Sequence, residues 1–345
     1  MVENNYKIRF FNPSREFKLH EKEYTKEWKR VRRNGSLILR EELESFEKNF
    51  AKFVGVKYAI GCNSGTDALL VALKALGVGP GDKILVPSHT FVATVQVVQQ
   101  VGAIPVLYDM DSIFEVTEGI KGIIVAHIAG NITVDMKLLK KIAKKENMFV
   151  IEDSCQALGA VQYDKKAGSF GDIGCFSFYP AKVLGGPGDA GALVTDDKNI
   201  YDFAIQFRNH WKKDYSQWGI NSRLDNVLAS ELNIKLKRLP KTLKRREQIA
   251  KLYLKGIRAI EILPRNTKGR IWQDFIVKTP KRDELYDYLK KEGIETMKNE
   301  YPMPIKKCPL SKEYESKTLR LPINEVLTDN EAKYIIKKIN KFYGY

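Results

Sequence analysis

Cysteine and histidine are both scarce in this chain of 345 residues. None of the four cysteines stands close enough to another to form a paired motif, so the sequence predicts neither a zinc site nor a disulfide scaffold. The four histidines are far apart and lack the spacing of metal ligands, so we expect no metal. This cysteine usage fits the reducing cytoplasm, where we expect the protein to be. The residues concerned are Cys62, Cys155, Cys175, Cys308, His20, His89, His127 and His210.

Long apolar runs are absent as well. No run approaches the roughly 20 apolar residues that a membrane-spanning helix needs. The opening stretch, "MVENNYKIRFFNPSREF", has no apolar core of the signal-peptide type. We therefore expect a cytoplasmic protein that does not engage a membrane.

Acidic residues are outnumbered, because 58 Lys and Arg face 42 Asp and Glu and give a formal net charge of +16. Such a charge is typical of a protein that binds an anionic partner, or of one whose solvent-exposed helix faces are rich in lysine and arginine. The densest basic runs, residues 26–33 and 235–255, are mixed with Glu and lack the regular aromatic interleaving of a nucleic-acid platform. We favour solvated helix faces and expect no nucleic-acid partner. The charge also suits an anionic small substrate, without identifying one.

Between residues 57 and 197, apolar runs of strand length alternate with amphipathic helical patterns. The alternation predicts an α/β fold with a mostly parallel sheet covered on both faces, and ligands bound beyond the carboxyl ends of the strands. With 43% hydrophobic residues, the chain can bury one large core or two ordinary ones. The predicted strands lie in residues 57–62, 82–88, 103–111, 121–130, 148–155, 173–180 and 191–197, and the predicted helices in 66–77, 90–102 and 134–147.

The pattern changes after about residue 200. Residues 221–260 form a long helical region that we expect to be broken or kinked near Pro240. A smaller α+β region follows, and its last helix begins after Thr328, which can cap it. We place the domain boundary at residue 240, which gives a large domain of residues 1–240, including an N-terminal arm of residues 1–35, and a small domain of residues 241–345.

Three segments at predicted strand ends carry residues that could bind a ligand or take part in catalysis. The first is "GCNSGTDALL". Ser64, Gly65 and Thr66 stand between a predicted strand and a predicted helix. A helix start offers free N–H groups and a partial positive charge, so small and hydroxylated residues there can hold a phosphate. The alternative is an ordinary N-cap by Ser64 or Thr66.

The second segment is "VIEDSCQALGA", in which Asp153 closes an apolar strand and Gln156 follows three residues later. A buried carboxylate is costly unless it is paired. Asp153 can hold a cationic ring nitrogen, and the Gln156 amide can donate to a ring oxygen. The alternative is a helix N-cap by Asp153 or Ser154.

The third segment is "CFSFYPAKVLGGPGDAGALV", with Ser177 at the strand end and Lys182 before a glycine-rich loop. A lysine in such company can attack a carbonyl, and the glycines permit close backbone approach. A solvated lysine at a strand end is the alternative. In this order, a phosphate cradle, a carboxylate with an amide, and a lysine predict a pyridoxal 5'-phosphate site.

These segments resemble the fold-type I pyridoxal-phosphate enzymes, and in particular the DegT/StrS family of sugar aminotransferases. The matching text includes "FEKNFAKFVGVKYAIGCNSGTDALL", "VIEDSCQALGA", "GSFGDIGCFSFYPAKVLGGPGDAGALV", "GINSRLDNVLASELNIKL" and "LRLPINEVLTDNEAKYIIKKI". The resemblance covers residues 36–345. It implies a three-layer large domain with a mostly parallel seven-stranded sheet, followed by a smaller C-terminal α+β domain.

The resemblance also implies a role for each matching position. Lys182 would link covalently to the cofactor, Asp153 would pair with the pyridine nitrogen, and Gln156 would reach the phenolic oxygen. Phe91 would stack on the ring. The phosphate would be held by Gly65, Thr66, Ser177 and, from the neighbouring subunit of a homodimer, Asn221. The candidate substrate residues are Tyr179, His210 and Lys306.

The implied activity is transfer of an amino group from glutamate to a nucleotide-linked keto sugar, giving an amino sugar for surface polysaccharide or glycoconjugate synthesis. Two departures affect the acceptor: the segment of residues 112–121 is shorter than in the family, and Lys306 stands where many members have histidine. A small keto acid, keto alcohol or cyclitol is therefore an alternative acceptor, and a catalytically silent regulator is a further alternative. Lys182 argues against the sister branch of dehydrating enzymes, which has histidine there.

Overall fold

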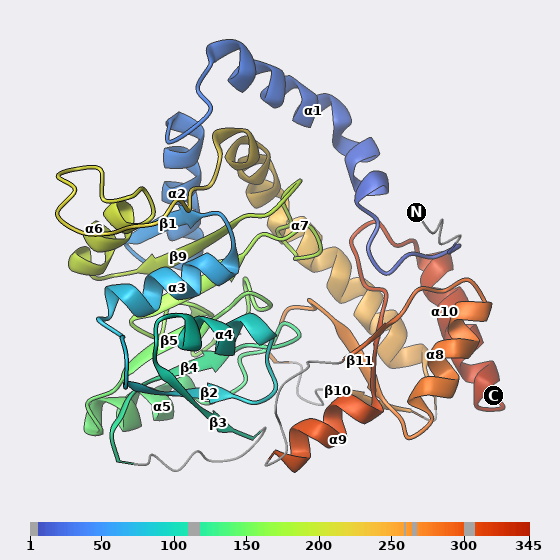
Figure 1. The fold of residues 1–345 in the computed structure, drawn as a ribbon. Coiled ribbons are helices and arrows are strands. Elements are labelled where there is room, and N and C mark those ends of the chain that lie inside the picture. Colours follow the sequence, from blue (N-terminus) through green and yellow to red (C-terminus); the bar gives the residue numbers. More distant parts are fainter. Residues whose placement is uncertain (1–5, 110–117, 259, 264–267, 300–307) are drawn as a thin grey trace.

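The computed structural model describes residues 6–109, 118–258, 260–263, 268–299 and 308–345 (Figure 1). Its centre is a seven-stranded sheet in the order β1-β9-β8-β5-β4-β2-β3. β9 runs antiparallel to both neighbours and the other pairings are parallel, which confirms the predicted sheet. Each predicted run corresponds to one strand, although β4 begins one residue before its run. The strands are β1 (Tyr58–Cys62), β2 (Lys83–Pro87), β3 (Ile104–Tyr108), β4 (Ile120–Ala126), β5 (Phe149–Asp153), β8 (Ile173–Ser177) and β9 (Gly191–Thr195).

Helices cover both faces of this sheet. Neighbouring strand residues such as Ala59 and Ile60 point to opposite faces and belong to different apolar cores. One core includes side chains of α3 (Gly65–Ala75), α4 (Val92–Gln100) and α6 (Lys198–Phe207). The other includes α2 (Glu41–Val54), α5 (Met136–Lys145) and α7 (Asn226–Gly256). The large unit therefore has the expected three layers.

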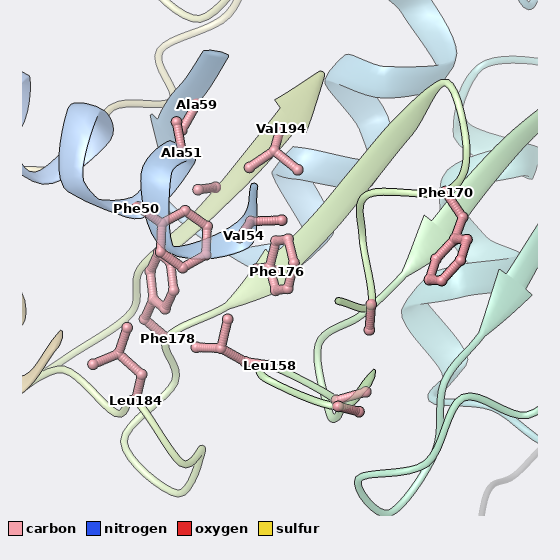
Figure 2. Close-up of a cluster of buried hydrophobic side chains, with 14 of the residues drawn as sticks. Phe50, Ala51, Val54, Ala59, Leu158, Phe170, Phe176, Phe178, Leu184 and Val194 are labelled. Carbon is pink, nitrogen blue, oxygen red and sulfur yellow. The ribbon is translucent and has the colours of Figure 1, made fainter. Parts of the chain in front are cut away.

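An aromatic cluster fixes the strand that leads to Lys182 (Figure 2). Phe176 and Phe178, at the end of β8, are almost fully buried and point to the α2 side of the sheet. Each meets Phe50 of α2 edge to face, with ring centroids 5.1 Å apart. Such pairs add roughly 0.5–1.5 kcal/mol beyond the area they bury. The aromatic run before Lys182 is therefore core, and it anchors the start of the lysine loop.

The smaller unit has an antiparallel sheet in the order β10-β11-β13-β12. Its last helix begins with a capping box, in which Thr328 Oγ1 accepts from the Glu331 N–H and the Glu331 carboxylate accepts from the Thr328 N–H. The predicted cap by Thr328 is thus confirmed. The elements are β10 (Glu261–Leu263), β11 (Phe275–Lys278), β12 (Met297–Lys298), β13 (Thr318–Leu321), α8 (Arg282–Lys291), α9 (Pro309–Lys317) and α10 (Asp329–Phe342).

α7 joins the two units as a single helix of 31 residues that contains Pro240. The helix is therefore not broken near Pro240, and the alternative of a kink there stays a prediction. The buried side chains of α7 belong to the large unit's core up to Leu239 and to the small unit's core from Ile249. The domain boundary at residue 240 falls inside this helix and stays a prediction. A short hairpin of β6 (Val161–Gln162) and β7 (Lys165–Lys166) completes the strands.

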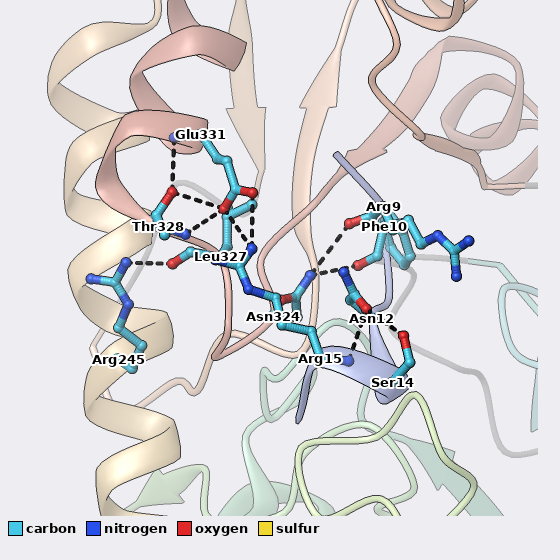
Figure 3. A network of polar contacts seen from close by, with 10 residues as sticks. All are labelled: Arg9, Phe10, Asn12, Ser14, Arg15, Arg245, Asn324, Leu327, Thr328 and Glu331. Atoms are coloured by element: carbon cyan, nitrogen blue, oxygen red, sulfur yellow. Dashed lines mark hydrogen bonds and ion pairs between the residues drawn. The ribbon is translucent and has the colours of Figure 1, made fainter. Parts of the chain in front are cut away.

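The N-terminal helix α1 (Pro13–Asn34) arches over α7, and its first turn is tied to the C-terminal unit (Figures 1 and 3). Arg15 forms an ion pair with Glu331 at 2.9 Å, while Asn324 donates to the backbone oxygen of Phe10 at 3.1 Å. Arg245 of α7 donates to the Leu327 oxygen beside them. Of the described helices, none is long and apolar enough to cross a bilayer.

Candidate active site

A buried carboxylate stands at the carboxyl end of β5. Asp153 is 6% exposed; its Oδ2 accepts from Thr94 Oγ1 at 2.7 Å and its Oδ1 from the Cys155 N–H at 3.2 Å. Thr94 donates its one hydroxyl proton to the carboxylate, so Thr90 must be the donor in the 2.8 Å contact between the two threonine hydroxyls. A directed chain from Thr90 through Thr94 therefore supports the negative charge of Asp153.

The residues after Asp153 form turns and no helix, so the N-cap alternative for Asp153 or Ser154 is wrong. Within these turns Gln156 is 8% exposed, and its Oε1 accepts from the Ala129 N–H at 3.0 Å. That contact occupies the amide oxygen and leaves the NH₂ end as the group that can donate to a ligand. Gln156 thus lies at the same sheet edge as Asp153, and its role toward a ring oxygen stays a prediction.

The start of α3 forms a tight cradle with the end of β8. Ser64 Oγ accepts from the Asp67 N–H at 3.0 Å, so the N-cap interpretation of Ser64 is correct. The next residue needs to be glycine, because a Cβ at Gly65 would lie 2.8 Å from Ser177 Cβ and 2.9 Å from Cys155 Sγ. The structure therefore brings Gly65 and Ser177 into contact at a helix N-terminus, the place where an anion is favoured. Thr66, the second residue of α3, is half-buried beside them.

The loop that carries Lys182 is held on both sides of the lysine. Gln273, from the C-terminal unit, accepts from the Val183 N–H and donates to the Ala181 oxygen, both at 3.1 Å. The Lys182 N–H itself donates to the Tyr179 oxygen at 2.8 Å. A Cβ at Gly185 would lie 2.1 Å from the Pro180 oxygen, so the tight turn requires glycine. These bonds fix the backbone of Lys182. A merely solvated lysine at a strand end would not need such support.

Cys155 connects these groups. Burial raises the pKa of the Cys155 thiol well above its ordinary value, the Asp153 carboxylate raises this pKa further, and the Lys182 ammonium lowers it. Both charges therefore lie close enough to act on one thiol, which itself packs against Gly65. Three sequence segments that are far apart thus meet at one place.

The remaining predicted residues lie further out. Phe91 is 57% exposed, and its backbone oxygen accepts from the Thr94 N–H at 3.0 Å, so it stands one turn from the Asp153 chain. Tyr179 is 53% exposed. His210 and Asn221 are exposed neighbours, because Asn209 and Asn221 form a β-bridge.

Two of the predicted substrate features cannot be placed. Lys306 lies outside the described residues, and so does most of the short segment of residues 112–121. A cavity of about 680 Å³ opens between α1, α7 and the lysine loop, and of the predicted cofactor residues Lys182 alone lines it. Within the described part of the chain, no group of His, Cys, Asp or Glu is arranged to hold a metal ion.

Sequence reasoning missed Thr94, Gln273 and Cys155 as members of the site. Thr94 reads as an ordinary helical threonine, and Gln273 lies 91 positions from Lys182 in the chain. Their signal is a spatial contact, which one sequence does not contain. Cys155 stands between Asp153 and Gln156, so its place in the motif could have drawn notice.

Comparison with known proteins gives consistent matches over nearly the whole chain. The model of the DegT/DnrJ/EryC1/StrS aminotransferase family matches residues 18–340. A dTDP-3-amino-3,6-dideoxy-alpha-D-galactopyranose transaminase of Aneurinibacillus thermoaerophilus is 36% identical, over 94% of this chain and 96% of its own. A DegT DnrJ EryC1 StrS aminotransferase from Brucella abortus superimposes with a TM-score of 0.92 at 30% identity, covering 98% of this chain and all of its own. S. venezuelae DesV, solved in complex with a ketimine intermediate, gives 0.91 at 31% identity, covering 98% and 99%.

Proposed function

The chain belongs to the DegT/DnrJ/EryC1/StrS aminotransferase family, and on that premise we propose that it transfers an amino group from glutamate to a nucleotide-linked keto sugar. The observation that carries the chemistry is the meeting of Asp153, Gln156, Lys182 and the Gly65–Ser177 cradle at one sheet edge. The acceptor class is proposed from the relative of A. thermoaerophilus, which is a transaminase named for a dTDP-linked amino sugar.

These residues fit pyridoxal 5'-phosphate. The start of α3 beside Ser177 suits a phosphate, because close packing at Gly65 leaves the helix N-terminus free of side-chain bulk. Asp153 is a buried carboxylate that can pair with a protonated ring nitrogen, and the NH₂ end of Gln156 can donate to an oxygen on the ring. Bound there, the cofactor supplies an electron sink for the bond broken at the donor's α-carbon.

The residues of the chain supply positioning and proton transfer. Lys182 would hold the cofactor through its side-chain amine. The same amine would serve as the base for the donor's α-proton and as the acid that returns a proton in the acceptor half-reaction, and Gln273 fixes the lysine's backbone on both sides for this role. Asp153, held by the hydrogen bond from Thr94, would face the ring nitrogen.

We propose amino sugars for surface polysaccharide or glycoconjugate synthesis as the products. Tyr179, His210 and Lys306 are the candidate residues toward the acceptor, and the short segment of residues 112–121 keeps a smaller keto acceptor as the second candidate. We also propose a homodimer with shared sites. Its support is that Asn221 is exposed, although its neighbour Ser222 bonds to Asn63 and Asp67 next to the cradle of its own chain.

Release of 2-oxoglutarate from glutamate in the absence of any acceptor tests the donor half of this proposal. The protein loaded with pyridoxal phosphate should release about one equivalent per site. Lys182→Ala should release it roughly 10²–10⁴-fold more slowly, because it loses the general acid–base group. Lys144→Ala, a change of an exposed lysine at the end of α5, should match the unchanged protein. Release at the normal rate by Lys182→Ala would overturn the assignment.

A further inference from the structure

Arg270 is a buried cation that the cofactor chemistry above does not use. Its side chain is 9% exposed and lies over the Trp272 ring, with Cζ 3.9 Å from the ring centroid. Nη2 donates to the Ala129 oxygen at 2.8 Å and Nε reaches the Ile271 oxygen at 3.4 Å. Nη1 is buried and has no hydrogen-bond partner among the described residues. Burial lowers the pKa of the guanidinium to about 10. The Asp274 carboxylate raises the pKa of Arg270 through its charge, but no hydrogen bond joins the two among these residues.

A buried charge that is not directly paired destabilises a fold, so the retention of Arg270 calls for a partner. The backbone oxygens of Ala129 and Ile271 satisfy part of the guanidinium but carry no charge. Nη2 has a second N–H and Nη1 has two. The guanidinium edge formed by Nη1 and Nη2 therefore still has donors that form no hydrogen bond among the described residues. A planar guanidinium edge with free parallel donors is the geometry that binds a carboxylate.

Arg270 is held directly behind Gln156. The Ala129 oxygen accepts from Arg270, while the Ala129 N–H donates to Gln156 Oε1. Ala129 adopts a φ of +54°, an uncommon conformation for a residue with a side chain. The neighbouring backbones are locked as well, because Ile271 donates to the Gly130 oxygen at 2.9 Å and a Cβ at Gly130 would lie 1.9 Å from the Ile271 oxygen.

The same segment also reaches the lysine. Three residues after Arg270, Gln273 bonds to Ala181 and Val183 on either side of Lys182. An extended chain covers roughly 10 Å over three residues. The segment of residues 270–273 therefore runs from the backbone beside Gln156 to the backbone on either side of Lys182.

We propose that Arg270 binds the α-carboxylate of the amino donor. This inference rests on the proposed function, since an amino-acid donor brings a carboxylate bonded to the reacting carbon. Arg270 is linked to Gln156 through Ala129, and its segment holds the Lys182 loop through Gln273, which suits the carboxylate nearest to that carbon. After transfer, the 2-oxo acid product binds Arg270 through the same carboxylate, so donor and product compete for one site.

The test uses Arg270→Gln and Arg270→Lys in the loaded protein, with Arg33→Gln, an exposed arginine of α1, as the matched control. The glutamate concentration at half-maximal single-turnover rate should rise roughly 10- to 100-fold in Arg270→Gln, in keeping with loss of a hydrogen-bonded charge partner. Arg270→Lys should recover part of this loss. The inhibition constant of 4-aminobutyrate, which is glutamate without the α-carboxylate, should stay unchanged in all variants.

Two further readouts separate binding from a structural role. The apoprotein's dissociation constant for pyridoxal phosphate and its melting temperature should be nearly the same in Arg270→Lys and in the unchanged protein. An unchanged glutamate dependence in Arg270→Gln, or equal weakening of glutamate and 4-aminobutyrate, would overturn the proposal. So would weakened binding of an acidic acceptor alone, which would assign the carboxylate to the acceptor. If the unchanged protein releases no 2-oxoglutarate, the proposed function itself fails.

Discussion

At the scale of single residues, the site depends on ordinary side chains that support a few reactive ones. Thr94 illustrates this, because its hydroxyl donates to Asp153 at 2.7 Å. Asp153 is buried and carries a charge whose desolvation is costly without donors. The contributions of Asp153 and Thr94 to stability are therefore expected to depend on each other.

We predict that Thr94→Val destabilises the apoprotein by about 1.5–3 kcal/mol, because a buried hydrogen bond to a charged group is lost. The substitution keeps the shape of the side chain, so the hydroxyl is the main change. Chemical unfolding of Thr94→Val, Asp153→Ala and the double variant measures the coupling. Thr94→Val should cost distinctly less when Asp153 is already absent. An equal cost in both backgrounds would show that the hydroxyl does not act through Asp153.

Residue types at strand ends were predictable, and their supports were not. Asp153 ends one apolar run and Lys182 follows another, so their place at the sheet edge follows from the strand pattern. Gln273 and Arg270 come from the other unit of the fold, and their roles depend on backbone contacts at Ala181, Val183 and Ala129. Nothing in their local sequence distinguishes them from surface or core residues.

At the scale of elements, periodicity predicted most of the fold. The seven apolar runs each gave a strand because buried parallel strands read as continuous Val, Ile and Leu. Pro240 was the misleading signal. A proline in a helix removes one backbone hydrogen bond, yet α7 packs against α1, α2 and α10 along its length. That packing outweighs the local penalty of about 3 kcal/mol.

Which elements contact one another was less predictable from the sequence than where each element lies in the chain. The start of α3 and the end of β8 touch at Gly65 and Ser177, more than 100 residues apart. A phosphate cradle of this kind needs both partners, whereas the sequence shows each one alone as a plausible cap or strand end. The resemblance to a family supplied the link that local pattern could not.

At the scale of the whole molecule, shared sites in a homodimer make a distinctive prediction. A Lys182→Ala subunit keeps Asn221, and an Asn221→Ala subunit keeps Lys182. If each site takes its lysine from one subunit and its asparagine from the other, a hybrid dimer of the two variants contains one complete site. Hybrids purified with two affinity tags should show about half the turnover of the unchanged dimer, in the same glutamate assay.

Both parent homodimers serve as controls for this experiment, since each carries a defect in both of its sites. A hybrid that shows only the average of its two parents would place Asn221 in the same site as the lysine of its own chain. That outcome would agree with the contacts of Ser222 to Asn63 and Asp67 within one subunit. It would remove the sharing of sites and leave the chemistry of Lys182 intact.

Nitrogen transfer to a panel of acceptors tests the central claim most directly. The protein, loaded with pyridoxal phosphate, is incubated with ¹⁵N-glutamate and with keto hexoses linked to dTDP, UDP or GDP, beside free keto sugars, keto acids and a keto cyclitol. Mass spectrometry then locates the label. The account predicts ¹⁵N in a nucleotide-linked amino sugar, with one 2-oxoglutarate formed for each. Label confined to a keto-acid or cyclitol product, with the donor half-reaction intact, would contradict it.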